Sequence, residues 1–166
     1  MSLRSASKED VSLVMRWWRD PSYMGDYQDA RMFSREELEK IMLKNTIFFI
    51  IEKKDGLKIG HIGSWMLGKT MEIGFALVPS ERRKGYGKEA IQLMVDYLFL
   101  TKDIVRIQVS TDTENSASQG ALEEVGFMKE GIMRRLWYTR GEYKDHYLYS
   151  ILKDEWKEPK ILKKAA

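Results

Sequence analysis

Short apolar runs bounded by turn residues predict the strands of this chain. Three runs in the first half are separated by turn signals around Gly56 and Gly68, so we expect them to form an antiparallel meander. A later run is rich in β-branched residues, and two long runs enclose a turn at residues 139–142. The predicted strands cover residues 3–6, 46–52, 58–67, 71–78, 104–110, 128–138 and 143–152.

Apolar positions repeat with the helical period in four other segments. Ser34 and Glu37 form a capping box that predicts the start of the second helix. Pro21 is expected to end the first helix and to leave a loop at residues 21–33, and Gly126 is expected to stop the last helix. The predicted helices cover residues 7–20, 34–44, 85–101 and 115–125.

The predicted elements follow the order β-α-α-β-β-β-α-β-α-β-β. This order predicts an α/β (α+β) fold, in which a mixed sheet of about seven strands is covered by four helices. The chain has 166 residues and shows no internal repeat or linker. We therefore expect a single domain over residues 1–166.

Composition excludes several kinds of site. The chain has no cysteine, which rules out disulfides, thiolate metal ligands and a cysteine nucleophile. Its two histidines, His61 and His146, lie in predicted strands, so we expect packed strand residues and no metal site. The net charge of +3 is modest and spread along the chain, which disfavours nucleic acid as a partner. No run approaches the ~18 apolar residues that span a membrane, and no apolar signal region begins the chain, so we expect a cytoplasmic protein.

The strongest candidate for a binding site is the turn Arg82-Arg-Lys-Gly-Tyr-Gly87, between the strand ending at Val78 and the helix that follows. Unpaired backbone N–H groups at a helix N-terminus carry partial positive charge, and glycine lets a ligand approach the backbone closely. Three cations lie in the same turn. This arrangement predicts a ligand that is rich in phosphate.

Three segments resemble the GNAT superfamily of acetyl-CoA-dependent N-acetyltransferases. The turn 82–87 fits the family's acetyl-CoA signature R/Q-x-x-G-x-G/A and lies between the fourth strand and the third helix, where the family places it. Asn115-Ser-Ala-Ser118 with Leu122-Glu-Glu-Val-Gly-Phe127, and Arg140-Gly-Glu-Tyr-Lys-Asp145, are similar to the branch that includes the ribosomal-protein N-terminal acetyltransferases. The resemblance implies the GNAT fold, acetyl-CoA as cosubstrate and an amine acceptor.

The resemblance also implies which residues hold acetyl-CoA. In the family the fourth and fifth strands part, the pantetheine arm lies between them, and the pyrophosphate rests on the turn before the third helix. Carried over, Leu77 and Val78 pair with pantetheine through their main chain, Asn115 bonds its amides, and Ser118 lies nearer the thiol. Asn115 is also a favoured helix N-cap, and both roles stay open. The residues expected to hold the pyrophosphate by backbone amides and charge are Arg83, Lys84, Gly85, Gly87 and Lys88, and Arg82 and Tyr86 are the other turn residues expected to bind the cofactor.

Acetyl transfer to an amine needs a neutral amine and a polarised thioester carbonyl. Glu72 is the candidate general base, because some family members place a catalytic glutamate on this strand and a positioned base accelerates proton transfer. The alternative interpretation of Glu72 is a surface carboxylate at a strand end. The backbone N–H of Ala76 or Leu77 is the candidate donor to the carbonyl oxygen.

The departing thiolate needs a proton. Many family members supply it from a tyrosine on the short fourth helix, but this chain has Ala121 and Leu122 there. Ser118 is therefore the candidate catalytic hydroxyl, which orients the thiol or relays a proton, and Tyr143 is a weaker alternative acid. The thiolate can also leave without a dedicated acid, because the pKa of a thiol is only about 8.5.

The first 33 residues are rich in aromatic side chains, and in GNAT folds this region covers the acceptor site. Trp17, Tyr23 and Tyr27 are expected to line the acceptor cleft, whereas Trp18 and Phe33 are expected in the core. No metal is expected in the site.

The amine pKa favours an N-terminal acceptor. An α-amino group has a pKa of about 7.7–8.0 and is partly neutral at pH 7, whereas a lysine near 10.4 is almost wholly charged. We therefore expect a peptide or protein N-terminal amine, with a small-molecule amine such as a polyamine, amino acid or antibiotic as the alternative. A non-catalytic CoA-binding sensor or interaction module is the alternative from another class. The family's habits also imply a homodimer.

Overall fold

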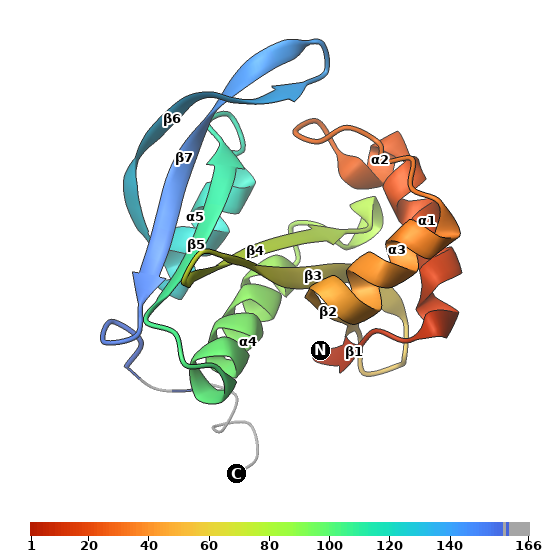
Figure 1. Ribbon diagram of the computed structural model, residues 1–166, viewed down its shortest axis with the longest axis horizontal. Helices are drawn as coiled ribbons and strands as arrows, with labels where there is room; N and C mark the ends of the chain where they lie inside the picture. Colours follow the sequence, from red (N-terminus) through yellow and green to blue (C-terminus); the bar gives the residue numbers. More distant parts are fainter. Residues whose placement is uncertain (158, 160–166) are drawn as a thin grey trace.

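The computed structural model describes residues 1–157 and 159, and seven strands of this part of the chain form one mixed sheet (Figure 1). Their order is β1-β2-β3-β4-β5-β7-β6. Neighbouring strands are antiparallel except β4 and β5, which run parallel. The bounds are Ser2–Ser5 (β1), Ile47–Glu52 (β2), Lys58–Leu67 (β3), Thr70–Leu77 (β4), Arg106–Asp112 (β5), Met128–Thr139 (β6) and Glu142–Leu152 (β7). The predicted meander and the closing hairpin are confirmed.

Helices cover both faces of the sheet (Figure 1). One face carries α1 (Val11–Arg19), α2 (Pro21–Met24) and α3 (Arg35–Lys40), and the other carries α4 (Tyr86–Thr101) and α5 (Ser116–Val125). Shorter helical turns lie at Lys8–Asp10 (η1), Ile41–Asn45 (η2) and Pro79–Glu81 (η3). The observed order of the main elements is the predicted one, with one helix more on the first face.

The additional helix is α2, which lies where a loop was expected. The carboxylate of Asp20 accepts a hydrogen bond from the backbone N–H of Ser22 at 2.8 Å and so caps a new helix. Pro21 takes the first helical position, where its missing N–H costs nothing. The proline therefore separates two helices instead of only ending one, and five α-helices lie in the described residues where four were predicted.

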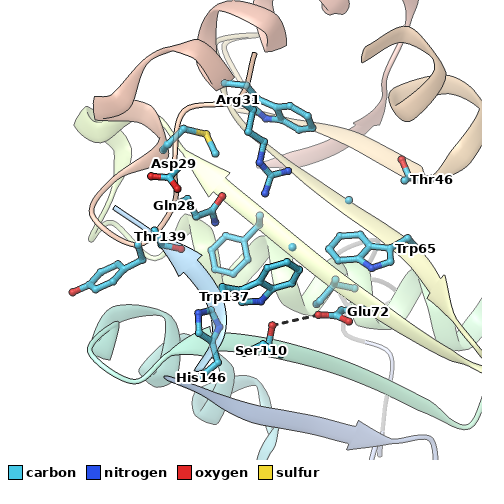
Figure 2. Close-up of a pocket in the computed structure, with 18 of the residues that line it drawn as sticks. Gln28, Asp29, Arg31, Thr46, Trp65, Glu72, Ser110, Trp137, Thr139 and His146 are labelled. Atoms are coloured by element: carbon cyan, nitrogen blue, oxygen red, sulfur yellow. Dashed lines mark hydrogen bonds between the residues drawn. The ribbon is translucent and has the colours of Figure 1, made fainter. Parts of the chain in front are cut away.

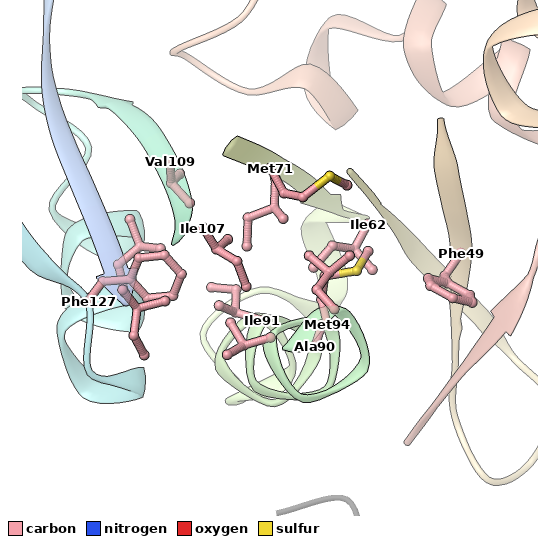
Figure 3. Packing of buried hydrophobic residues seen from close by; sticks show 14 of the residues in the cluster. Phe49, Ile62, Met71, Ala90, Ile91, Met94, Ile107, Val109 and Phe127 are labelled. Atoms are coloured by element: carbon pink, nitrogen blue, oxygen red, sulfur yellow. The ribbon is translucent and has the colours of Figure 1, made fainter. Parts of the chain in front are cut away.

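The larger core lies between α4 and the sheet (Figure 3). Ile91, Met94 and Leu98 of α4 are fully buried against sheet residues such as Ile62 and Ile107. The predicted apolar stripe of this helix is confirmed, since its members are all buried: Ala90, Ile91, Met94, Val95, Leu98 and Phe99. This packing fixes the N-terminus of α4 at the end of β4.

Strands β4 and β5 part soon after they meet. Their parallel pairing covers only two pairs, Met71 with Ile107 and Glu72 with Gln108. Each strand then continues along its other neighbour, β4 along β3 and β5 along β7. The main chain of β4 beyond Glu72 is therefore free of a strand partner on one side, as the resemblance implied.

The β6–β7 hairpin bends across the end of the sheet where the strands part (Figure 1). Its register shifts between Met133 and Trp137, which is the signature of a bulge that bends the strand. At its tip the Arg140 guanidinium donates to the carbonyl of Gly25 at 2.6 Å, and the Arg140 backbone N–H donates to Asp29 at 3.2 Å. The hairpin thus contacts the loop that follows α2.

Candidate active site

A cavity of about 770 Å³ lies where β4 and β5 part, and we call it the central cavity. Its wall is built from strands β2 to β5, the β6–β7 hairpin, Met24 at the end of α2, and residues of the loop after α2 as far as Arg31 (Figure 2). The volume suits a small ligand or the end of a larger one. Much of the wall is aromatic, with side chains from Trp18, Tyr27, Phe48, Trp65, Phe75, Trp137 and Tyr138.

Glu72 and Ser110 meet in the wall of the central cavity, one from each parting strand. The Ser110 hydroxyl donates a hydrogen bond to Glu72 Oε1 at 3.4 Å (Figure 2). Burial raises the pKa of Glu72 above its usual range, against the opposing effect of hydrogen bonds from Gln108 and Ser110. A half-buried carboxylate with a raised pKa is suited to accept a proton near neutral pH, which is the chemistry predicted for Glu72.

The turn before α4 has the backbone geometry of an anion site. Gly85 precedes the helix with a φ of 84°, in the left-handed region that favours glycine, and no side chain caps the helix there. The first N–H groups of α4 lack partners within the helix, so they can bind phosphate oxygens. Gly87 lets the helix start close to β4, because a Cβ at this position would lie 3.3 Å from Phe75 Cε2.

Three cations of the turn lie on its exposed surface. The side chains of Arg83, Lys84 and Lys88 are exposed. Lys84 and Lys88 each approach a glutamate, at 3.4 Å and 2.6 Å respectively. The pair of Lys88 with Glu124 is exposed on both sides and therefore weak, so Lys88 can exchange it for a phosphate. Tyr86 instead packs against the core beneath α4.

Arg82 faces away from this phosphate-binding arrangement. Its Nε donates to the Leu77 carbonyl at 3.1 Å, and one terminal nitrogen donates to the carbonyls of Ser22 and Tyr23 at 3.0 and 2.6 Å. The guanidinium thereby joins the end of β4 to α2. The Arg82 side chain thus links the two halves of the site, and the cofactor contact expected for this residue stays a prediction.

Along β4, the backbone hydrogen-bonding groups of every second residue point toward the gap beside β5. The Val78 N–H donates to the carbonyl of Ile59 at 2.8 Å, which is on the β3 side. Because hydrogen-bonding groups alternate along a strand, Leu77 and Phe75 face the gap. The Leu77 N–H therefore points toward the gap and its predicted pantetheine contact stays a prediction, whereas the Val78 N–H is bonded to β3. Of the two candidate oxyanion donors, Leu77 faces the gap and Ala76 faces β3.

Asn115 and Ser118 lie at the start of α5. Asn115 Oδ1 accepts a hydrogen bond from the Ser118 N–H at 3.1 Å, so Asn115 is the N-cap of this helix. Neither residue lines the central cavity that holds Glu72. Their predicted contacts with the pantetheine amides and the thiol stay predictions.

The aromatic residues of the N-terminal region are distributed differently from the prediction. Tyr23 is only 1% exposed, and Trp17 stacks on it at 5.1 Å between ring centroids. Tyr23 fills the core beneath α2 and does not line the central cavity, so the expectation for Tyr23 is corrected. Trp17 is half-buried and also lies outside the cavity wall, and its contact with the acceptor stays a prediction. Tyr27 does line the cavity, and its hydroxyl donates to the carbonyl of Glu114 at 3.0 Å. Trp18, expected in the core, is buried and also forms part of the cavity wall.

Both histidines are buried strand residues, as expected, and both line the central cavity. Burial, reinforced by the nearby Arg31 charge, lowers the pKa of His61 to about 3, so its ring is neutral near pH 7. His61 Nδ1 lies 2.7 Å from the hydroxyl of Tyr23. Burial also lowers the pKa of His146, against the opposing charges of Asp112 and Asp145.

Sequence reasoning missed Ser110, Arg31 and Trp137 in the cavity wall. Ser110 is one of several polar residues in its strand, and only the parallel register shows that it meets Glu72. Arg31 lies in a loop without a motif. The alternation of side chains along β6 could have indicated the face of the sheet on which Trp137 lies. The bulge before Trp137 changes that face.

Comparison with known proteins decides the family. The model of the acetyltransferase (GNAT) domain matches residues 1–128. The chain belongs to the GNAT acetyltransferases. The N-acetyltransferase p20 of Bacillus licheniformis is 29% identical over 94% of each chain.

Two solved structures share the fold at lower identity. Ribosomal-protein-S5-alanine acetyltransferase from Vibrio fischeri is 21% identical with a TM-score of 0.81, over 94% of both chains. Spermidine N-acetyltransferase from Vibrio cholerae, in complex with CoA and spermine, is 22% identical with a TM-score of 0.80, over 93% of this chain and 96% of that one.

As a GNAT acetyltransferase, the protein uses acetyl-CoA as the acetyl donor for an amine acceptor. The turn geometry fits the cosubstrate, because the uncapped start of α4 and its exposed cations suit a pyrophosphate. No cluster of three or more potential ligands in residues 1–157 and 159 is placed to hold a metal ion. Within the same residues, no helix is long and apolar enough to cross a membrane.

Proposed function

We propose that this GNAT acetyltransferase acetylates the N-terminal amine of a peptide or protein. The observation that carries the proposal is the charge of the central cavity. Its wall contains two carboxylates, Glu72 and Asp29, and one guanidinium, Arg31. Asp29 already accepts a hydrogen bond from Arg140. A wall with so little free negative charge is poorly matched to a polycation, whereas it suits an acceptor with a single amine.

Glu72 is the proposed general base in this reaction. Acetyl-CoA supplies the acetyl group as a reactive thioester. Glu72 accepts the proton that the amine loses as its nitrogen bonds to the acetyl carbon and the carbon–sulfur bond breaks. An α-amine needs less help than a lysine side chain, because its pKa of about 7.7–8.0 leaves part of it neutral at pH 7. Ser118, by the family resemblance, is proposed to orient the thiol or return its proton.

A small-molecule amine is the second candidate acceptor. One structural neighbour is a spermidine N-acetyltransferase, although an identity of 22% supports only a shared fold. The aromatic wall could surround one cationic amine by cation–π contacts. Arg31 opposes a second or third ammonium group in the same cavity, which is why we rank polyamines below N-terminal amines.

Acceptor-dependent release of the CoA thiol tests the proposal. The purified protein is incubated with acetyl-CoA and one acceptor at a time: short peptides with a free N-terminus, the same peptides with the N-terminus blocked and one lysine free, spermidine, and an aminoglycoside. We expect the free N-terminal peptides to give the highest rates and the blocked ones to give little turnover. Faster turnover of spermidine than of every peptide would instead establish the second candidate. Glu72→Gln is the matched control that should lower the rate with each acceptor.

A further inference from the structure

Arg31 is the one guanidinium in the wall of the central cavity among the described residues. Its side chain extends from the loop after α2 into the cavity (Figure 2). The Arg31 backbone N–H donates to the carbonyl of Trp18 at 2.7 Å, which anchors the loop at this residue. The guanidinium carbon lies 5.1 Å from the centre of the Trp18 ring, so the tryptophan supports the charge by a cation–π contact.

This guanidinium lacks a carboxylate partner in the described part of the chain. No ion pair joins Arg31 to a described acid, although it is a planar group that suits bidentate pairing with a carboxylate. Arg31 is an exposed residue, yet the protein around its guanidinium desolvates it enough to lower its pKa. A charge held partly dry is stabilised when an opposite charge arrives.

A second hydrogen-bond donor lies beside Arg31 without a partner. The indole Nε1 of Trp18 is buried and makes no hydrogen bond to any residue in the described ranges, and the residue is only 5% exposed. The third neighbour, His61, is kept neutral by burial and by the Arg31 charge. This part of the wall therefore offers donors and a positive charge, and the nearby acid Asp29 already accepts a hydrogen bond from the Arg140 backbone N–H.

Glu72 lies on the opposite side of the cavity from Arg31 (Figure 2). Burial raises the pKa of Glu72, hydrogen bonds from Gln108 and Ser110 oppose this rise, and Arg31 is not among the groups that shift it. The cavity therefore has a negative side and a positive side. An acceptor with an amine and an acid would match both.

We propose that the acceptor carries a carboxylate that pairs with Arg31 while its amine lies toward Glu72. The inference rests on the proposed acetylation of an amine in this cavity and names the acceptor's chemistry more closely. The carboxylate has two possible sources: an acidic side chain in the first residues of a peptide, or the free α-carboxylate of an amino acid. The same pairing with Arg31 serves either source.

Matched acceptors that differ only in charge test the pairing. One arm compares peptides that carry Asp or Asn, and Glu or Gln, at the first, second or third residue, and the other compares free amino acids with their amides. We expect kcat/KM for at least one acid to exceed that of its amide by about tenfold or more, because a charge-assisted pair is stronger than a neutral contact. Equal kcat/KM values for acid and amide in both arms would overturn the proposal.

Substitution of Arg31 assigns the preference to this residue. Arg31→Gln should remove the preference for the acid, so that each acid and its amide give similar kcat/KM values. Arg31→Lys keeps the charge and should retain part of the preference. Arg16→Gln makes the same charge change at an exposed position of α1 and should leave the preference intact. If the preference survives in Arg31→Gln, the proposal is wrong.

A binding measurement separates this inference from the proposed function. If only amino acids are turned over, the N-terminal peptide proposal fails and the Arg31 proposal stands. If no acceptor is turned over, the N-acetylated products are titrated in the presence of CoA, with tryptophan fluorescence as the signal. About tenfold tighter binding of acidic products to the wild type, lost in Arg31→Gln, supports the pairing, and equal binding of acids and amides rejects it.

Discussion

The two faces of the sheet are built on different principles. On the α4 face, one regular helix buries a continuous apolar stripe against the strands, and the phosphate-binding turn follows directly from where that helix begins. On the α1–α3 face, short helices and a loop are joined to β4 by polar contacts, in which Arg82 bonds three carbonyls and the Tyr23 hydroxyl contacts His61 and the Ala76 carbonyl. The cosubstrate side is therefore fixed by packing, and the acceptor side by a smaller buried cluster together with specific hydrogen bonds. Substitutions on the two faces should have separable effects.

The largest effect, a loss of catalytic rate, is expected when Glu72 in the wall of the central cavity is substituted. Glu72→Gln should lower kcat by about 10²- to 10⁴-fold, because the positioned base is lost, with little change in acetyl-CoA affinity. In the wild type the rate should fall with decreasing pH through the raised pKa of Glu72, and this acidic limb should be absent in the variant. A pH–rate profile of both proteins checks this, and superimposable profiles would remove Glu72 from the mechanism.

Glu72→Gln is also expected to change how the stability of the protein depends on pH. A folded-state pKa above the unfolded value means that Glu72 contributes stability at pH values below its unfolded pKa, and loses that contribution as pH rises through the folded pKa. A neutral glutamine avoids this loss. Glu72→Gln should therefore be at least as stable as the wild type near pH 8, as measured by thermal unfolding.

The next effect is a loss of stability on the packed face. Ile91 is fully buried between α4 and the sheet, so Ile91→Ala should lower the free energy of unfolding by about 2–5 kcal/mol. Urea unfolding measures this change. Val105→Ala is the control, because Val105 is 70% exposed and should change stability by less than about 0.5 kcal/mol. Similar losses in the two variants would contradict the packing account.

A smaller, more selective effect is expected on the polar face. Tyr23→Phe removes the hydroxyl that lies 2.7 Å from His61 Nδ1 and 3.1 Å from the Ala76 carbonyl. Leaving a buried imidazole nitrogen unpaired should cost about 1–3 kcal/mol of stability. The KM for the acceptor should rise more than the KM for acetyl-CoA. Tyr143→Phe, at an exposed tyrosine, is the stability control.

The smallest change in stability is expected at the cosubstrate turn. Gly85→Ala forces a Cβ onto a residue with a φ of 84°, which should cost about 1–2 kcal/mol, although no atom within 4 Å would clash. Because the turn would relax to avoid this strain, the KM for acetyl-CoA should rise with little change in the acceptor KM. An increase confined to the acceptor KM would reverse the assignment of the two faces.

The regular elements were predictable because their signals are local. The stripe of α4, the meander of β2 to β4 and the closing hairpin each follow from a period within one segment. The helix α2 was missed because Pro21 both follows one helix and begins another, and only the Asp20 cap decides between these readings. Tyr23 was assigned to the cleft because aromatic density does not reveal which side of a short helix faces the core.

The sequence by itself determined the cosubstrate turn, because glycines, cations and a helix start are contiguous in residues 82–88 and their geometry depends on local backbone conformation. Only the tertiary structure decided the acceptor side. Glu72 meets Ser110 through a parallel pairing across 38 residues, and the cavity brings Arg31, Trp18 and the β6–β7 hairpin together from separate segments. Such a site depends on strand register and on which face each segment presents, and these are set by packing between elements far apart in the chain.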